Sequence, residues 1–496
     1  MTLPSHKTKI VATIGPASDA PEMLERLVRA GLNVARLNFS HGDFSGHADR
    51  IARIRAAARA TGRRVAILAD LPGPKMRLGR IEPEPIHLDA GETFTLTGDD
   101  VTGDRRRVST SFEPLPRVVK PGDTLYLNDG LVHLVVERVV GRDVTCRVAV
   151  GGELRSKKGL NLPGIRLGIG AFTAHDRACL EFALRHGVDA VSQSFVESAA
   201  DIESVRAASR EFGGNPFIIA KIERAGALEH LDGIVAAADG IMVARGDLGV
   251  EVPIEDVAIL QKQLIARASL AGKPVITATQ MLESMTHSRL PTRAEATDVA
   301  NAILDGTDGV MLSGESAMGR YPEEAVAMLA RIAARTEAHQ AAAAADGSAT
   351  RRRAGPRPAT AAEALAAMAE HAIETVPCAA IFVPTRTGTT ARLISRFNPP
   401  VWIVALCRDE AVCQGLAFSY GVHPVRLERD PDDWNAFARR WLREHPRPGR
   451  VALLLAGPTP EAPAAAHRIE FLRVDESDDR PVPDRRARRR ARSRRR

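Results

Sequence analysis

The stretch FIIAKIERAGALEHLDGIVAAADGIMVARGD, residues 217–247, decides the fold of this chain. It contains two continuous apolar runs, 217–223 and 240–247, and each run ends in charged residues. Continuous apolar character over five to eight residues is typical of strands that are buried on both faces, as in a parallel sheet. Six further runs of this kind recur along the chain: 9–15, 33–40, 65–70, 190–195, 274–280 and 309–315.

Amphipathic segments follow most of these runs. Their apolar residues recur at three- and four-residue spacing, which predicts helices over 21–30, 47–60, 175–186, 200–212, 254–271, 293–304 and 322–339. Eight βα units close naturally into a (β/α)8 barrel, whose active site forms at the C-terminal ends of the strands. The sequence therefore predicts an α/β protein built on a TIM barrel.

Other patterns interrupt and follow the barrel pattern. Short alternating runs with Gly and Pro between them predict an inserted small β-barrel domain, an all-β lid that would exclude water from the site. Mixed strand-like and helical runs predict a C-terminal α/β domain. The predicted bounds are 1–73 and 171–340 for the catalytic barrel, 74–170 for the inserted lid, 341–360 for a linker, 361–475 for the C-terminal domain and 476–496 for a disordered Arg-rich tail.

The composition indicates a cytoplasmic protein with several domains. Five scattered cysteines without a CxxC pair are expected to be free thiols, and we expect neither a signal peptide nor a membrane span. The formal net charge is +7, but nine arginines lie among residues 485–496, and without them the charge becomes −2. The basic charge thus belongs to the tail, which is either solvated and disordered or an arm that binds nucleic acid or another polyanion.

Charged residues at the ends of the fifth and sixth runs predict a catalytic centre. Glu223 and Asp247 would lie on neighbouring strand ends, where two carboxylates suit Mg²⁺ or Mn²⁺ with waters or substrate oxygens as further ligands. Lys221 is a compact positive charge suited to a transferring phosphoryl group, and the glycines beside Asp247 let backbone N–H groups approach an anion. The alternative is a plain salt bridge between Lys221 and Glu223.

A second group of polar residues ends the second run. Arg36, Asn38 and Ser40 alternate, so we expect them on one face, where Arg can fork onto phosphate and the Asn and Ser oxygens can bind a cation or nucleotide. A polar strand end that faces water is the alternative. Thr279 adds a hydroxyl at the same rim. The sequence contains neither a Walker loop nor the kinase HRD and DFG motifs, so neither standard nucleotide scaffold is expected.

Several long strings resemble the pyruvate kinase family, in the right order. They include NVARLNFSHG at 33–42, KKGLNLPG at 157–164, DGIMVARGDLG at 239–249, ATQMLESM at 278–285, PTRAE at 291–295 and MLSGE at 311–315. The resemblance covers residues 6–335 and, more loosely, the third domain. It implies Mg²⁺-dependent phosphoryl transfer from phosphoenolpyruvate to ADP, giving pyruvate and ATP, by a cytoplasmic glycolytic homotetramer.

The resemblance also implies a role for each site residue. Arg36 and Lys221 would contact the transferring phosphoryl group, with Lys221 stabilising its transition state. Glu223 and Asp247 would hold the Mg²⁺. The Gly246 and Asp247 amides with Thr279 would receive the substrate carboxylate, and Thr279 would lie on the proton route to the enolate. The implied nucleotide side consists of Asn38, Ser40, His41, Arg77 and Lys158 or Lys157.

One departure from the family pattern concerns potassium. Many members have DTKGPE after the third strand and require K⁺, whereas this chain has DLPGPK at 70–75. Lys75 replaces an acidic residue beside the monovalent-cation site that the resemblance implies for Asn38, Ser40, Asp70 and the Leu71 carbonyl. Because an ammonium group would supply the charge that K⁺ brings, we predict activity without added K⁺.

Two further expectations concern regulation and alternative functions. TRTGTT at 385–390 resembles the family's loop for a phosphorylated effector, although a turn with ordinary helix capping is the alternative, and 457–466 lacks the usual glycines. An inactive scaffold that binds polyanions through its Arg tail is disfavoured because the expected catalytic positions are filled. A Mg²⁺-dependent lyase or aldolase acting on pyruvate is disfavoured by the β insertion, since a lid over a nucleotide is needed only if a nucleotide binds.

Overall fold

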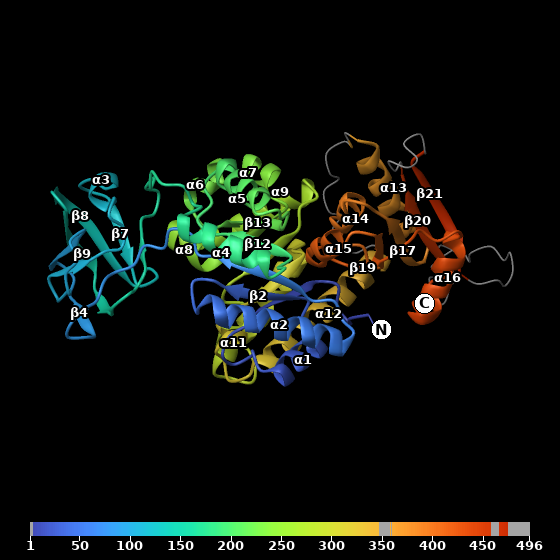
Figure 1. Ribbon diagram of the computed structural model, residues 1–496, viewed down its shortest axis with the longest axis horizontal. Coiled ribbons are helices and arrows are strands. Elements are labelled where there is room, and N and C mark those ends of the chain that lie inside the picture. Colours follow the sequence, from blue (N-terminus) through green and yellow to red (C-terminus); the bar gives the residue numbers. More distant parts are fainter. Residues whose placement is uncertain (1–2, 347–357, 359, 458–465, 475–496) are drawn as a thin grey trace, which may run out of the picture.

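The computed structural model describes residues 3–346, 358, 360–457 and 466–474. Figure 1 shows three bodies in a row: the inserted β domain, the central barrel and the C-terminal sheet domain. The predicted Arg-rich tail lies outside the described residues, as does most of the predicted linker and of segment 457–466. No helix in the described ranges is long and apolar enough to cross a membrane.

Eight parallel strands close into the predicted barrel, in the order β1-β16-β15-β14-β13-β12-β3-β2. Nearly all of their residues are buried, because side chains fill the inside and helices cover the outside. The strands are β1 (Lys9–Thr13), β2 (Val34–Asn38), β3 (Ala66–Leu71), β12 (Ala190–Gln193), β13 (Phe217–Ile222), β14 (Gly240–Ala244), β15 (Val275–Ala278) and β16 (Gly309–Leu312). The TIM-barrel prediction is confirmed.

Helices surround this barrel close to where the apolar periodicity predicts them. Local caps set several of their ends: Thr173 and Thr292 each begin a helix with a capping box, and Gly62 ends one in the left-handed conformation. The helices are α1 (Pro21–Ala30), α2 (Phe44–Thr61), α4 (Ala174–Arg185), α5 (Ala199–Glu211), α6 (Ala225–Glu229), α7 (Leu231–Ala237), α8 (Arg245–Glu251), α9 (Val257–Leu270), α10 (Arg293–Asp305), α11 (Gly314–Ala317) and α12 (Pro322–Asp346), with single 3₁₀ turns at Ile254–Asp256 and Glu283–Thr286.

Two strands end earlier than predicted. β2 ends at Asn38, so Ser40 lies in the following turn and the expected alternation does not reach it. β14 ends at Ala244, and α8 begins at Arg245. Gly246 and Asp247 therefore lie in the first turn of a short helix and not at a strand end, because apolar patterning does not mark where a strand gives way to a helix.

The inserted domain is all-β apart from one short helix, as predicted. Its hydrogen-bonded strands form a six-stranded sheet, β11-β7-β8-β9-β5-β6, and a separate pair, β10-β4, around their own core. The elements are β4 (Ile86–Leu88), β5 (Thr93–Thr97), β6 (Arg107–Ser109), α3 (Leu115–Val118), β7 (Thr124–Leu127), β8 (Val132–Val140), β9 (Asp143–Val150), β10 (Gly152–Leu154) and β11 (Leu160–Asn161).

The C-terminal domain has the predicted, mainly parallel sheet, in the order β19-β18-β17-β20-β21, with only β21 antiparallel. Figure 1 shows helices on both sides of this sheet. The elements are α13 (Ala361–Thr375), β17 (Cys378–Pro384), α14 (Thr389–Ser395), β18 (Trp402–Cys407), α15 (Glu410–Gly415), a 3₁₀ turn at Leu416–Phe418, β19 (Val422–Arg426), α16 (Trp434–Glu444), β20 (Val451–Ala456) and β21 (Arg468–Arg473).

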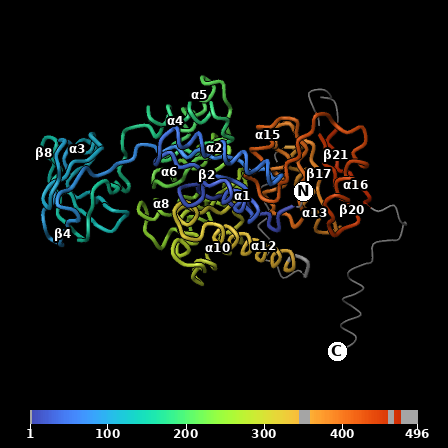
Figure 2. Tube along the Cα trace, turned by 60° about the horizontal axis from the view of Figure 1, so that its bottom comes forward, coloured from blue at the N-terminus to red at the C-terminus, as the bar shows by residue number. Residues whose placement is uncertain are grey.

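Two predictions in this half of the chain are wrong. Cys407 and Cys413 are joined by a disulfide, because the chain turns back after β18 and brings their Cα atoms within 6.2 Å; Cys146, Cys179 and Cys378 are free, as predicted. The linker does not begin at residue 341, since α12 continues to Asp346 through alanines, the strongest helix formers. Figure 2 shows α12 packed beside α10 and extending beyond it, with the N-terminus beside the C-terminal domain.

Candidate active site

A buried lysine lies at the centre of the predicted site. Lys221, on β13, is 9% exposed, and its Nζ lies 3.0 Å from Glu223 Oε2 and 3.8 Å from Asp70 Oδ1. The ammonium also donates a 2.7 Å hydrogen bond to Ser194 Oγ. Burial alone would lower the pKa of Lys221, but the negative charges around it more than offset burial and raise that pKa. Lys221 is therefore protonated at neutral pH.

Arg36 and Asp70 form the second part of the network. The Arg36 guanidinium donates through Nη2 and Nε to Asp70 Oδ2, at 2.5 and 3.2 Å, and through Nη1 to Thr13 Oγ1 at 2.7 Å. Ser192 Oγ donates to Asp70 Oδ1 at 2.6 Å. Although burial opposes ionisation, Lys221, Arg36 and Ser192 hold the pKa of Asp70 at about 2. Two nitrogens of the Arg36 guanidinium thus donate to one oxygen of Asp70, and these bonds hold the side chain at the mouth of the barrel.

Glu223, the residue after β13, and Asp247, in the first turn of α8, are the predicted metal ligands. Phe195 N–H donates to Glu223 Oε1 at 2.7 Å, which leaves Oε2 buried beside Lys221 without an aligned hydrogen bond. Burial is the main cause that raises the pKa of Glu223, and the negative charge of Asp247 adds to the rise. In the described residues no group of three or more His, Cys, Asp or Glu could hold a metal. Two carboxylates fit Mg²⁺, which keeps waters or phosphate oxygens as its other ligands.

Thr279 and Gly246 contact each other at the ends of β15 and β14. Gly246 N–H donates to Thr279 Oγ1 at 2.7 Å, and the Thr279 hydroxyl donates to the Ala278 carbonyl. Thr279 has φ of 70°, a conformation that β-branched residues rarely adopt and that is common at functional sites. A Cβ on Gly246 would lie 3.3 Å from Thr279 Oγ1, so glycine permits this close approach. Thr279 is thereby aimed at the first turn of α8.

The predicted nucleotide side is only partly assembled around the barrel. Asn38 Oδ1 accepts from Ser40 N–H at 3.0 Å, and burial with the charges of Lys75, Arg77 and Arg36 lowers the pKa of His41. Arg77 Nη1 donates to the Lys157 carbonyl of the inserted domain. Lys158 lies on the inserted domain, and it takes no part in the described contacts among Arg36, Asp70, Lys221 and Glu223.

Lys75 lies within electrostatic reach of the implied cation site. Burial and Lys221 lower the pKa of Lys75, while Asp70 and Asp247 act in the opposite direction. The Leu71 carbonyl accepts a 2.7 Å hydrogen bond from Ser194 Oγ. The oxygens of Asn38, Asp70 and Leu71 are therefore already engaged within the protein.

Sequence reasoning missed the residues that orient Lys221 and Asp70. Ser192 and Ser194 lie two apart in the fourth predicted run, and this alternation is the signal that could have found them. Phe195 acts through its backbone N–H, with φ of 60°, and has no signature in the sequence.

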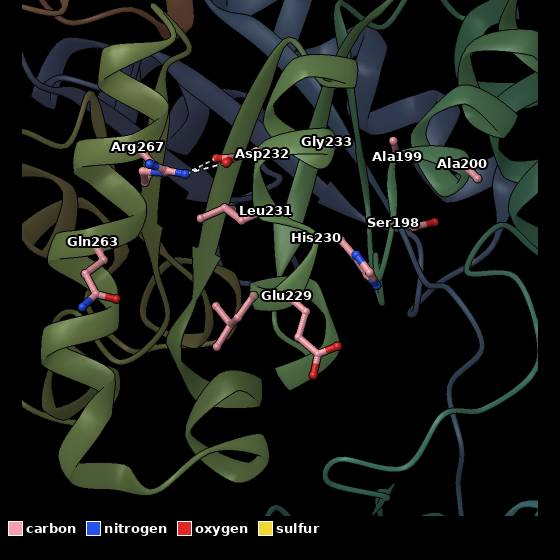
Figure 3. Close-up of a pocket in the computed structure, with 11 residues that line it drawn as sticks. Ser198, Ala199, Ala200, Glu229, His230, Leu231, Asp232, Gly233, Gln263 and Arg267 are labelled. Carbon is pink, nitrogen blue, oxygen red and sulfur yellow. Dashed lines mark hydrogen bonds and ion pairs between the residues drawn. The ribbon is translucent and has the colours of Figure 1, made fainter. Parts of the chain in front are cut away.

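A separate cavity of about 810 Å³ lies on the outside of the barrel. Figure 3 shows its lining from α5, α6, α7 and α9, with Asp232 and Arg267 paired at 2.5 Å. None of the predicted site residues lines it. The chemistry indicated by the charges belongs to the barrel mouth and not to this outer cavity.

Comparisons with known proteins agree with the fold and identify the family. The family model for the barrel domain of pyruvate kinase matches residues 5–326, and that for the pyruvate kinase alpha/beta domain matches residues 363–457. Pyruvate kinase from Thermococcus litoralis is 50% identical over 434 residues, 87% of this chain and 90% of the relative. That from Mycobacterium intracellulare is 40% identical over 96% of this chain and all of the relative. The crystal structure of a pyruvate kinase from Cryptosporidium parvum superposes with a TM-score of 0.87, at 36% identity, and covers 95% of this chain and 97% of that one.

Together, a closed parallel barrel and a cationic mouth with two carboxylates define a phosphotransferase of the TIM-barrel class. The chain belongs to the pyruvate kinase family. It transfers the phosphoryl group of phosphoenolpyruvate to ADP, giving pyruvate and ATP in glycolysis. The family generally depends on a divalent metal and on potassium.

Proposed function

We propose that Lys221 and Arg36 contact the transferring phosphoryl group, and that Lys221 stabilises its transition state. The observation that carries this proposal is the buried Lys221 ammonium, 3.0 Å from Glu223 Oε2 and fixed by Ser194. Phosphoryl transfer needs positioning and charge neutralisation more than covalent help. A rigid cation in a site sheltered from water supplies both, because it needs no reorganisation as charge moves.

In the proposed reaction, the phosphorus–oxygen bond of phosphoenolpyruvate breaks and a terminal ADP oxygen forms the new bond to phosphorus. The remaining enolate takes a proton at its methylene carbon and becomes pyruvate. Gly246, Asp247 and Thr279 would hold the substrate carboxylate, and Thr279 would lie on the proton route. Asn38, Ser40, His41, Arg77 and Lys158 would bind the nucleotide, which requires the inserted domain to bring Lys158 toward the barrel.

We propose that Glu223 and Asp247 hold Mg²⁺ or Mn²⁺. When bound, the metal would neutralise charge on the phosphoryl oxygens. Replacing Glu223 with Gln removes one of two carboxylate ligands, so the Mn²⁺ concentration for half-saturation should rise at least about tenfold. Water-proton relaxation measures Mn²⁺ binding without turnover. Glu229→Gln, an exposed carboxylate on the neighbouring α6, is the matched control. Unchanged Mn²⁺ binding in Glu223→Gln would overturn the metal assignment.

We further propose that the enzyme works without K⁺. The hydrogen bonds already made by Asp70 and the Leu71 carbonyl, and the electrostatic interaction of Lys75 with Asp70, support this proposal. In buffers containing neither Na⁺ nor K⁺, wild type should reach at least about half of its maximal rate, and Lys75→Glu should become K⁺-dependent. The coupled assay with phosphoenolpyruvate, ADP and Mg²⁺ measures both. A strict K⁺ requirement of the wild type would refute the proposal.

The remaining predictions about assembly, regulation and compartment stay proposals. A homotetramer is supported by exposed apolar side chains such as Ile254 and Ile259, which are 73% and 55% exposed. Light scattering tests this assembly.

For a phosphorylated effector, the loop 385–390 offers Thr hydroxyls that in this structure form hydrogen bonds within the loop, as Thr385 Oγ1 does by accepting from Gly388 N–H. Titration with inorganic phosphate tests that site. We also propose that the protein acts in the cytoplasm.

A further inference from the structure

A buried arginine outside the predicted site connects three segments of the chain. Arg224 directly follows Glu223, and its side chain is 3% exposed. Its Nη1 lies 3.0 Å from Glu251 Oε1, and its Nε lies 3.1 Å from Glu197 Oε1. Its Nη2 donates a 2.8 Å hydrogen bond to the Ile165 carbonyl. Each of the three nitrogens therefore binds a different segment.

Each of these segments has a place in the proposed reaction. Ile165 lies on the return segment, residues 162–173, which leads from the inserted domain back to the barrel. Glu251 is the last residue of α8, whose first turn carries Gly246 and Asp247. Glu197 follows Phe195, whose N–H holds Glu223. Arg224 thus ties the inserted domain to both loops that present the predicted metal ligands.

The inserted domain touches α8 at a second point. Its turn between β7 and β8 brings Gly130 to Val250, so that a Cβ on Gly130 would lie 3.7 Å from both Val250 methyl groups. The backbone of Gly164, beside Ile165, also interacts with Glu251 and acts to lower the pKa of that carboxyl. Figure 1 shows α8 at the edge of the barrel that faces the inserted domain. The position of the inserted domain is therefore coupled to α8.

A buried guanidinium is costly unless it is paired with an opposite charge and hydrogen-bonded. Arg224 uses three directions on three segments, which a lysine with its single charged nitrogen could not reproduce. We propose that Arg224 is a positioning residue that holds the inserted domain in the orientation in which ADP is bound between that domain and the barrel. This proposal rests on the proposed nucleotide site.

Loss of Arg224 should affect the binding of the two substrates to different extents. Phosphoenolpyruvate is predicted to bind barrel residues alone, whereas ADP is predicted to need Arg77 and Lys158 from the side of the inserted domain. Loss of Arg224 should therefore weaken ADP binding much more than phosphoenolpyruvate binding. A merely structural role would instead lower thermal stability and change both Michaelis constants by the same factor.

The test compares Arg224→Met and Arg224→Lys with the control Arg166→Met. Arg166 adjoins Ile165 on the same segment but is 88% exposed in its side chain, so its loss should change nothing. In Arg224→Met the KM for ADP should rise at least about tenfold and the KM for phosphoenolpyruvate less than about threefold. The constants of Arg224→Lys should lie between those of wild type and Arg224→Met. Equal changes in both constants, or none, would overturn the proposal.

Hydrogen–deuterium exchange gives a second readout that needs no activity. Amides of residues 162–173 should exchange at least about tenfold faster in Arg224→Met, while those of β13 and β14 stay as in wild type. Unchanged exchange at 162–173 contradicts the proposal. If the wild type turned over neither substrate, the proposed function would fail, but exchange would still decide whether Arg224 holds this segment. If Arg224→Met does not fold, Arg224→Lys decides by the same readouts.

Discussion

Glu251 is a carboxylate with little access to water and an unusual proton affinity. Burial raises its pKa to about 7 even though Arg224 lies 3.0 Å away, and the neighbouring charge of Glu197 adds to the rise. Asp70 is the opposite case, since two cations and a serine hydroxyl keep its pKa at about 2 in spite of burial. Two buried carboxylates of one barrel rim thus differ in charge state near neutral pH, because only Asp70 has enough partners.

The raised pKa of Glu251 predicts a pH-dependent stability. The native state keeps a proton that the unfolded chain, with an ordinary pKa of 4.5, has already released, so the free energy of unfolding should fall as pH rises from 4.5 to about 7. Glu251→Gln replaces this titratable carboxyl with a neutral amide, so the free energy of unfolding should depend less on pH. Thermal unfolding midpoints of both proteins across this range measure the effect. Parallel curves for the two proteins would show that Glu251 titrates normally.

Charged side chains at the ends of buried strands could be predicted from the sequence, and their partners could not. Lys221 and Glu223 stand out because charge follows a continuous apolar run. Ser194 is neutral and small, so only its alternation with Ser192 marks it, and Phe195 contributes only a backbone N–H, which the sequence does not mark. Arg224 was missed because its partners lie 27 and 59 positions away along the chain.

Among the elements, apolar periodicity predicted which segments form helices and strands but not where they end. α8 begins inside the predicted sixth run, and α12 continues into the predicted linker. Ends depend on capping contacts, such as those of Thr292 at the start of α10, which periodicity does not contain. The Cys407–Cys413 disulfide likewise depends on how α15 folds back, which spacing alone does not reveal.

The capping box of α10 gives a prediction for a single element. Thr292 Oγ1 accepts from Glu295 N–H, and Glu295 in turn accepts from Thr292 N–H at 2.8 Å. Thr292→Ala should therefore lower the free energy of unfolding by about 1 kcal/mol. Thr297→Ala, an exposed threonine in the middle of the same helix, is the control and should change it by less than about 0.5 kcal/mol. Urea unfolding followed by circular dichroism compares them, and equal losses would deny a special role for the cap.

In the whole molecule, three bodies are joined by hydrogen bonds, ion pairs and close packing, some of them buried. Lys9, the first residue of β1, donates a 2.7 Å hydrogen bond from Nζ to the Val422 carbonyl of the C-terminal domain. Burial lowers the pKa of Lys9 to about 8. Arg64 and Glu410 pair across the same boundary. On the opposite side of the barrel, Arg224 and the Gly130 turn hold the inserted domain. The sequence predicted the three bodies, but the contacts between them join residues too distant in sequence to be paired by pattern.

In the proposed mechanism, the Lys221 ammonium neutralises the phosphoryl group as it moves between substrates. Lys221→Met should lower kcat by about 10³-fold or more, because the cation acts where charge develops in the transition state. Mn²⁺ binding should stay within about threefold of wild type, since Glu223 and Asp247 remain. Lys221→Arg keeps the charge but displaces it, and provides the comparison if the methionine variant does not fold.

The most direct measurement is therefore the turnover number of Lys221→Met in the coupled assay with saturating phosphoenolpyruvate, ADP and Mg²⁺, alongside its Mn²⁺ titration. We expect a folded protein that binds metal and scarcely turns over substrate. A kcat within about tenfold of wild type would contradict it, because a charge central to the transition state cannot be removed at so small a cost.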